Sequence, residues 1–149
     1  MPRGAEPVRF DHLTLLVTDL DEATRFLGVL GFEVTRNVVI SGAEMDAYMG
    51  IEGLEADHVT LSVPGAEPHE EVQLLRFHHP PSVADGGSGR LDRVGFNHVC
   101  FSVTDLDATV AEFADAGFKT RNTPMVFADR TLVFLDGPGD AVVELAQWM

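Results

Sequence analysis

The stretch Phe10-Asp-His-Leu-Thr-Leu-Leu-Val-Thr-Asp-Leu-Asp21 occurs a second time in the chain, as Phe96-Asn-His-Val-Cys-Phe-Ser-Val-Thr-Asp-Leu-Asp107. Seven of the twelve aligned positions are identical. The same offset of 86 residues aligns Gly31-Phe32 with Gly117-Phe118. A repeat of this kind indicates that the chain contains two copies of one supersecondary unit.

Each copy begins with strand-forming residues and continues into Thr18-Asp-Leu-Asp21 or Thr104-Asp-Leu-Asp107, a Thr-x-x-acid pattern typical of a helix start. Gly31 and Gly117 are expected to end these helices in the left-handed conformation. Three strands are predicted to follow in each copy, near 32–39, 57–63 and 71–77, and near 118–122, 130–135 and 141–148. The pattern predicts an α+β fold made of two tandem βαβββ modules.

The modules have simple expected boundaries within one domain, residues 1–149. Module 1 covers about 8–77 and module 2 about 96–148. The linker between them, about 78–95, is rich in Pro, Gly, Ser and Asp and includes Asp85-Gly-Gly-Ser-Gly89. Residues 41–55 lack a counterpart in module 2. They predict a helical turn that either covers the open end of the sheet or contacts substrate as a lid.

Composition restricts the partners and the compartment. A chain of 149 residues can bury a substantial core without disulfides. Ten basic and 24 acidic residues give a net charge of −14, which argues against nucleic acid and anionic membranes as partners. Cys100 is the single cysteine, and no apolar run approaches the ~18 residues of a membrane span. A cytoplasmic location is the default expectation.

Alternate residues of a strand point to opposite faces of a sheet, so each strand can be sorted by its uniformly apolar side. That side holds Leu13, Leu15, Val17, Val72 and Leu74 in module 1, and Val99, Phe101, Val103, Val143 and Leu145 in module 2. The other side carries His12, Gln73, His98 and Glu144. One such histidine alone is usually a hydrogen-bonded core residue. Four donors on one half-dry face would need partners, and a divalent metal satisfies all of them.

Four segments of the sequence resemble the vicinal-oxygen-chelate superfamily, which includes glyoxalase I, methylmalonyl-CoA epimerase, fosfomycin-resistance proteins, extradiol dioxygenases and bleomycin-binding proteins. The segments are Asp11-His-Leu-Thr, Val72-Gln-Leu-Leu-Arg-Phe, Asn97-His-Val-Cys-Phe-Ser-Val-Thr-Asp-Leu-Asp and Val143-Glu-Leu. The resemblance implies a curved, barrel-like mixed sheet with the helices outside. It also implies one divalent ion (Zn, Co, Ni, Mn or Fe(II)) held by His12, Gln73, His98 and Glu144.

The ligand set is similar to those of methylmalonyl-CoA epimerase and glyoxalase I. The resemblance therefore implies an isomerase, epimerase or lyase that removes a proton next to a carbonyl of a small substrate through an enediolate. A homodimer is expected. An iron(II) extradiol-type dioxygenase, with Gln73 as a bystander, and a non-catalytic binding protein for antibiotic resistance remain alternatives.

The proton-transfer reaction implied by the resemblance gives several residues expected roles. Glu144 is the expected base as well as a ligand, and His58 is either a second acid or base or a histidine hydrogen-bonded to Thr60 or a loop. Arg130, which the repeat alignment pairs with His58, either binds a substrate carboxylate or is solvated. Thr60 and Cys100 are expected near substrate, with packing as the alternative for Cys100. His69, His78 and His79 are expected to be solvated.

Overall fold

The computed structural model describes residues 7–84 and 86–149, so Asp85 of the expected linker lies outside the described residues. Module 1 contains β1 (Leu13–Leu16), α1 (Leu20–Val29), β2 (Glu33–Ser41), α2 (Ala43–Met49), β3 (Glu55–Ser62) and β4 (Glu71–His79). Module 2 contains β5 (Val99–Ser102), α3 (Leu106–Asp115), β6 (Met125–Phe127), β7 (Arg130–Asp136), the 3-10 helix η1 (Pro138–Asp140) and β8 (Val142–Trp148).

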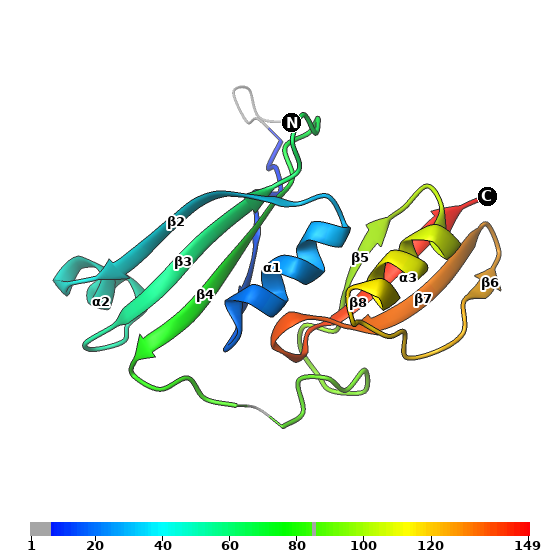
Figure 1. Cartoon of the computed structure of the whole chain (residues 1–149). Helices are drawn as coiled ribbons and strands as arrows, with labels where there is room; N and C mark the ends of the chain where they lie inside the picture. The colour runs from blue at the N-terminus through cyan, green and yellow to red at the C-terminus, as the bar shows by residue number, and fades with distance from the viewer. Residues whose placement is uncertain (1–6, 85) are drawn as a thin grey trace.

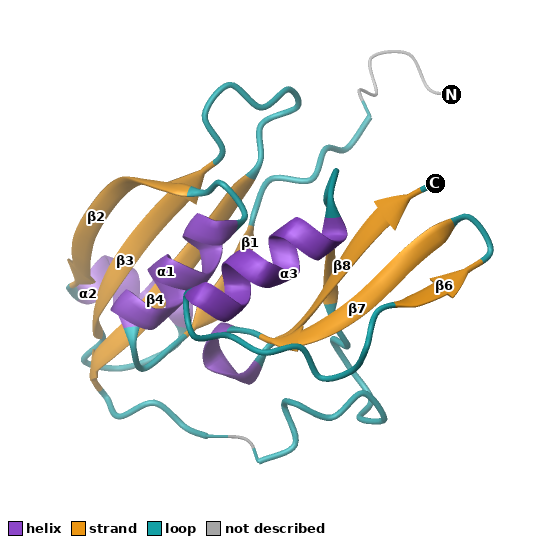
Figure 2. Cartoon of the chain, turned by 45° about the vertical axis from the view of Figure 1, so that its right-hand side comes forward, coloured by secondary structure: helices purple, strands orange, loops and turns teal. Residues whose placement is uncertain are grey.

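The strands form two separate four-stranded mixed sheets, with the orders β1-β4-β3-β2 and β5-β8-β7-β6. The first strand of each module pairs in parallel with the last, and the other neighbours are antiparallel. Figures 1 and 2 show the sheets side by side, with α1 and α3 on the same side of them. The predicted α+β fold of two βαβββ modules is confirmed. The sheets are curved and do not close into a barrel.

The first helix of each module begins one residue later than the sequence pattern suggests. Asp19 caps α1 by accepting from the Glu22 backbone N–H, and Asp105 caps α3 by accepting from that of Ala108. The caps are therefore the aspartates and not the preceding threonines. Gly31 follows the end of α1 at a φ of +92°, which confirms the left-handed stop.

One hydrophobic core joins the two modules through their helices. The Phe26 ring from α1 lies 4.8 Å from that of Phe113 in α3 and 5.0 Å from that of Phe118. The inner side chains of β4 and β8, including Leu74 and Leu145, are fully buried in the same core. The apolar face predicted from the strand alternation is thereby confirmed.

Two local expectations are wrong. In place of a strand near 118–122, a single bridge joins Thr120 to Leu135, and the edge strand β6 forms further along the chain. His78 belongs to β4 and not to a linker, because its ring contacts Glu55 at 2.9 Å and Asp57 at 2.8 Å across the β3–β4 pair. These two carboxylates hold the end of β4 in the sheet.

The segment without a counterpart in module 2 forms α2, which packs beside β2. The Asp46 carboxylate accepts from the backbone N–H groups of Gly53 and Leu54 and thereby closes the turn after the helix. Tyr48 on this helix is largely exposed. Within the described part of the chain, no helix has the length and apolar character required to span a bilayer.

Candidate metal centre

Equivalent strands place Gln73 and Glu144 on the same face of their sheets. In module 1, Gln73 lies between Thr14 of β1 and Thr60 of β3. In module 2, Glu144 lies between Cys100 of β5 and Phe134 of β7. We call the face that carries Gln73 or Glu144 the donor face, and the opposite face packs against the helices.

His12 and His98, which directly precede β1 and β5, are held by the residue before each of them. Nδ1 of His12 contacts the Asp11 carboxylate, and Nδ1 of His98 lies 2.6 Å from Oδ1 of Asn97. The Asn97 amide also donates to the Leu91 carbonyl at 2.7 Å, so its oxygen must be the end that faces His98. Nδ1 of His98 therefore carries a proton, and in the neutral ring its Nε2 offers a lone pair.

That lone pair faces a carboxylate. Nε2 of His98 lies 3.3 Å from Oε1 of Glu144, and the Glu144 side chain is only 15% exposed. The edge-to-face contact with the Phe134 ring, 5.2 Å between centroids, helps to fix the His98 ring. A neutral imidazole nitrogen and a carboxylate oxygen are both acceptors. Two ligands about 2.0–2.2 Å from one ion are roughly 3 Å apart, so this pair has the spacing that a bound cation requires.

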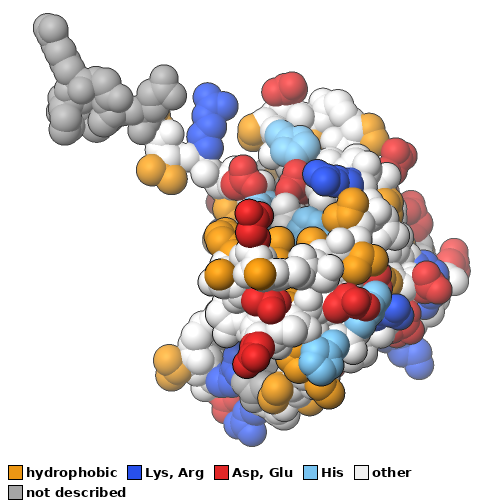
Figure 3. Space-filling model, turned by 90° about the vertical axis from the view of Figure 1, so that its left-hand side faces the viewer, with side chains coloured by type: hydrophobic (Ala, Val, Ile, Leu, Met, Phe, Trp, Pro, Cys, Tyr) orange, Lys and Arg blue, Asp and Glu red, His pale blue; other side chains and the backbone are white. Residues whose placement is uncertain are grey.

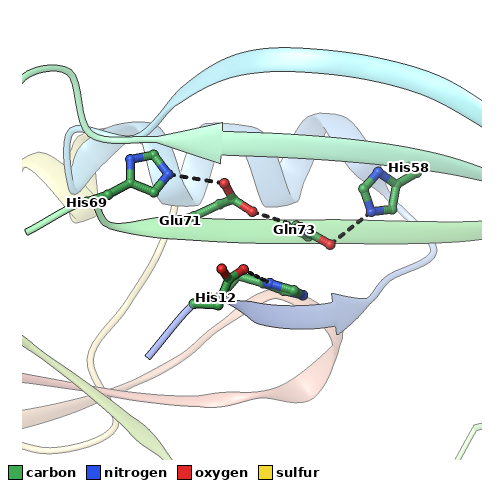
Figure 4. Close-up of polar contacts among 6 residues, drawn as sticks. His12, His58, His69, Glu71 and Gln73 are labelled. Atoms are coloured by element: carbon green, nitrogen blue, oxygen red, sulfur yellow. Dashed lines mark hydrogen bonds and ion pairs between the residues drawn. The ribbon is translucent and has the colours of Figure 1, made fainter. Parts of the chain in front are cut away.

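Module 1 carries a continuous chain of polar contacts on its donor face (Figure 4). His69 Nε2 lies 3.1 Å from Glu71 Oε1, and Glu71 Oε2 accepts from Gln73 Nε2 at 2.7 Å. Gln73 Oε1 in turn lies 2.9 Å from His58 Nε2. Since that amide oxygen can only accept, Nε2 of His58 is the protonated nitrogen. Figure 3 shows histidine and acidic side chains close together on this side of the molecule.

Two residues of this cluster were not predicted. Asp11 had a signal in the sequence, because it occupies the place before His12 that Asn97 occupies before His98. Glu71 had a weaker one, since it lies two residues before Gln73 and therefore on the same face. His69 was expected to be solvated; its side chain is 64% exposed, and its ring also contacts Glu71.

The ligand atoms of His12, His98 and Glu144 do not form one close group within the chain. Among the described residues, Asp11, His12 and Glu71 form the one group of three His, Cys, Asp or Glu side chains whose ligand atoms all lie within 4.8 Å of one another. His98 and Glu144 do not join it. His98 lies beside Glu144 in module 2, and His12 and Gln73 lie on the donor face of module 1; we call these two pairs of predicted ligands the half-sites.

The direction of the strands explains the separation. In Figure 1 the dark blue β1 descends behind α1, whereas the yellow-green β5 ascends. The end of β1 lies against η1, where a Cβ on Gly139 would approach the Leu16 carbonyl oxygen to 2.5 Å. β1 and β5, which His12 and His98 directly precede, therefore run in opposite directions in this view.

A cavity of about 820 Å³ lies between the two modules, lined by residues on either side of His12 and by residues of β5. Its apolar wall comes from both modules, and Asp11, His69 and Glu71 contribute polar groups at one side while Cys100 lines the other. Its lining residues are Arg9, Phe10, Asp11, Leu13, Phe32, Pro68, His69, Glu70, Glu71, Val72, Val99, Cys100 and Phe101. A small molecule can thus reach Asp11, His69 and Glu71, whereas His12 and Gln73 themselves do not line this cavity.

The remaining predicted residues have distinct environments. The Thr60 side chain shares the donor face with Gln73. Partial burial, with Glu144 beside it, raises the pKa of Cys100 to about 11, so the free thiol is neutral near pH 7. The guanidinium of Arg130 lies 4.2 Å from the centre of the Trp148 ring and is only partly exposed, so it is not simply solvated.

Arg130 is not the structural counterpart of His58, which corrects the sequence alignment. Thr60 pairs with Gln73, and Phe134 pairs with Glu144, so the position equivalent to His58 holds Leu132. The connection between β7 and β8 is shorter than that between β3 and β4. An alignment that fits the last strand therefore fails in the strand before it.

Comparison with known proteins agrees with this architecture. A model of the glyoxalase/bleomycin resistance protein/dioxygenase superfamily matches residues 11–134. A comparison with curated protein sequences gives no match. A glyoxalase family protein from Bacillus cereus superimposes with a TM-score of 0.88 at 21% identity, covering 100% of this chain and 99% of that one.

Two further structures share the fold. A glyoxalase I variant from Zea mays gives a TM-score of 0.64 at 15% identity, covering 91% of this chain and 43% of that one. The fosfomycin resistance protein FosX from Listeria monocytogenes gives 0.59 at 14% identity, covering 97% and 94%. The repeated modules, the paired half-sites and the sequence match lead to one conclusion: the chain belongs to the glyoxalase/bleomycin resistance protein/dioxygenase superfamily.

Proposed function

We propose that the protein is a metal-dependent isomerase, epimerase or lyase that removes a proton next to a carbonyl of a small substrate. The observation that carries the proposal is the approach of His98 Nε2 to Glu144 Oε1 at 3.3 Å, with Nδ1 of the same ring already committed to Asn97. With a neutral His98 ring these are two facing acceptors, and a cation between them would satisfy both. The proposed ligands of one divalent ion are His12, Gln73, His98 and Glu144, a donor set that zinc, cobalt, nickel, manganese and iron(II) accept.

The proposed chemistry divides between the ion and the side chains. A divalent ion held there would polarise a substrate carbonyl and stabilise negative charge on its oxygen. Glu144 is the proposed base, since it is the one carboxylate among the four ligands and lies in a half-dry setting beside Phe134. Its carboxylate takes the proton from the carbon and returns it. His58 is the proposed second acid, with Thr60 next to it on the substrate side.

We further propose that a second copy of the chain completes the site. Within one chain the His98–Glu144 pair does not reach His12. The donor face of module 2 also leaves Met125, Phe127 and Trp148 about half exposed. Exposed apolar side chains around a polar site are typical of an interface. A symmetric homodimer in which module 2 of each chain covers module 1 of its partner would bury them and unite the four ligands twice.

Mixing two inactive variants tests the shared site. His12→Ala damages the module 1 half-site, and His98→Ala damages the module 2 half-site, so each variant alone should lose the metal. A refolded equimolar mixture should recover metal in roughly a quarter of its sites, because each mixed dimer contains one intact pair of half-sites. Elemental analysis measures the recovery. No recovery on mixing, with full occupancy in the unmodified protein, would show that each chain builds its own site.

Isotope exchange tests the reaction. In deuterated water, the native protein should exchange the hydrogen next to the carbonyl of a hemithioacetal or a 2-methyl-3-oxo thioester. Glu144→Gln keeps an oxygen ligand and loses the proton acceptor, so it should retain metal and lose on the order of a hundredfold in exchange rate. An unchanged rate would assign the base elsewhere, to His58 first. If the native protein binds no metal in metal-replete medium, the non-catalytic binding protein becomes the better interpretation.

One observation supports an oxidative alternative. Gln73 Oε1 already accepts a hydrogen bond from His58, as expected for a bystander beside two histidines and one carboxylate. We favour ligation because an amide oxygen has a second lone pair for the ion. Anaerobic loading with iron(II), followed by oxygen-uptake assays on catechols, separates the two. Catechol-dependent uptake at catalytic rates would replace the proton-transfer assignment.

A further inference from the structure

We propose that Glu71 is a positioning residue that orients the Gln73 amide so that its oxygen, and not its nitrogen, is presented as the metal ligand. The inference rests on the proposed function, because it concerns the same site. It assigns a task to a carboxylate that the ligand set and the reaction leave unused. The observation is the hydrogen bond of 2.7 Å from Gln73 Nε2 to Glu71 Oε2.

An amide side chain has two nearly isosteric ends, and only the oxygen has a lone pair suited to a metal. A free glutamine can turn either end toward the ion. An ionised carboxylate accepts hydrogen bonds and cannot donate, so it holds the nitrogen end of the amide. The reverse orientation would place the amide oxygen against the Glu71 carboxylate at the same short distance. Glu71 thus selects one of two orientations before any ion arrives.

The surroundings of Glu71 fix both of its carboxylate oxygens. Gln73 Nε2–H donates to Oε2 at 2.7 Å, and His69 Nε2 lies 3.1 Å from Oε1. The Glu71 side chain is 18% exposed, so this hydrogen bond is partly shielded from water. At the other end of the amide, His58 Nε2–H donates to Oε1 and supports the same orientation.

Module 2 provides an internal comparison. The residue that occupies the place of Glu71 there is Val142, two positions before Glu144 on the same strand and face. Val142 is buried and makes no polar contact with the ligand. The two oxygens of a carboxylate are equivalent, so Glu144 needs no orientation. The orienting carboxylate therefore occurs in the module whose ligand is an amide and is replaced by an apolar residue in the other.

The experiment is a cycle of four proteins: the native chain, Glu71→Ala, Gln73→Glu and the double variant. Cobalt(II) alone is the probe, and its affinity is measured by competition with a chromogenic chelator, with the visible absorption spectrum as the report of the ligand set. Glu70→Ala is the control, because it removes a neighbouring exposed carboxylate that does not contact Gln73. Thermal unfolding of the metal-free proteins shows whether each variant folds.

In the native background, Glu71→Ala should weaken cobalt binding by about 10- to 100-fold, the usual effect of removing a residue that orients a ligand, and Glu70→Ala should not. In the Gln73→Glu background no orientation is needed, and the two carboxylates repel each other. There, Glu71→Ala should leave binding unchanged or tighten it. Weakening of similar size in both backgrounds would overturn the inference, since it would reflect general attraction or strand stability. Absence of cobalt binding by the native chain would overturn the proposed function itself.

Discussion

The packing between the two modules can be tested directly by measuring the effect of a substitution at Phe26 on stability. This residue is fully buried on α1, and its ring contacts those of Phe113 and Phe118 in module 2. Removal of a buried phenylalanine ring costs about 3–5 kcal/mol through lost transfer energy and the cavity left behind. Two well-placed aromatic contacts add on the order of 1 kcal/mol. We expect Phe26→Ala to lower the free energy of unfolding by about 4–5 kcal/mol, within the upper part of that range.

Urea unfolding followed by two probes measures this effect. Trp148 fluorescence reports on module 2 alone, because the chain has a single tryptophan, whereas far-ultraviolet circular dichroism reports on both modules. If one core joins the modules, both signals should shift together although the substitution lies in module 1. Tyr48→Ala, at a side chain that is 84% exposed, should change stability by less than about 0.5 kcal/mol.

Two outcomes would refute this reasoning. A loss below about 1 kcal/mol for Phe26→Ala would mean that the interface relaxes and contributes little to stability. An unchanged Trp148 transition beside a shifted dichroism transition would mean that the modules unfold independently. In either case the relative placement of the two half-sites could not be attributed to the aromatic contacts between α1 and α3.

Two further predictions concern pH and a close backbone contact. Hydrogen bonds from the His78 ring to Asp57 and then to Glu55 raise the pKa of His78, and the bond between His78 and Asp57 lowers the pKa of Asp57. The difference in unfolding free energy between the native chain and His78→Gln should therefore be full just below the ordinary histidine pKa of about 6.5 and decline as pH rises through the raised pKa. It should also decline in acid as Asp57 is protonated. A constant difference across urea titrations from pH 4 to 9 would contradict this. Gly139→Ala should destabilise by more than about 1 kcal/mol, because Gly139 has a φ of +62° and an added Cβ would meet the Leu16 carbonyl oxygen. The control is Gly28→Ala inside α1, where the added Cβ meets open space, and it should stabilise by about 0.5–1 kcal/mol in the same denaturation assay. Equal effects at the two glycines would show that the contact between Gly139 and β1 is not tight.

The fold could be predicted from the sequence because its signals are local and occur twice. The repeat defined the modules, and the alternation along the last strands placed Leu74 and Leu145 in the core. The helix caps were displaced by one residue because threonine and aspartate are adjacent at both starts and both can cap. The equivalence of His58 and Arg130 failed because hairpin length sets the register, and the two hairpins differ in length.

The candidate site was predictable as residue types and not as an arrangement. The four ligands were chosen from strand alternation and the resemblance. The proton position on His98 depends on the Leu91 carbonyl, which fixes the Asn97 amide from a distant turn. The separation of the half-sites depends on how β1 meets η1 from the other module. Such contacts between distant segments leave no periodic signal in the sequence.

The two half-sites keep their carboxylates in different places, and this bears on which ligand can move. In module 1 the carboxylate of Asp11 lies behind His12, while the ligand on β4 is a neutral amide. In module 2 the neutral amide of Asn97 lies behind His98, while the ligand on β8 is a carboxylate. A carboxylate behind an imidazole raises its basicity as a ligand, so His12 should bind the ion more firmly than His98. The proposed base, Glu144, would then dissociate from the ion to accept a proton, while the half-site of module 1 keeps the ion bound. Asp11→Asn should therefore weaken metal binding more than Asn97→Ala weakens it through His98, and the reverse order would exclude this division of roles.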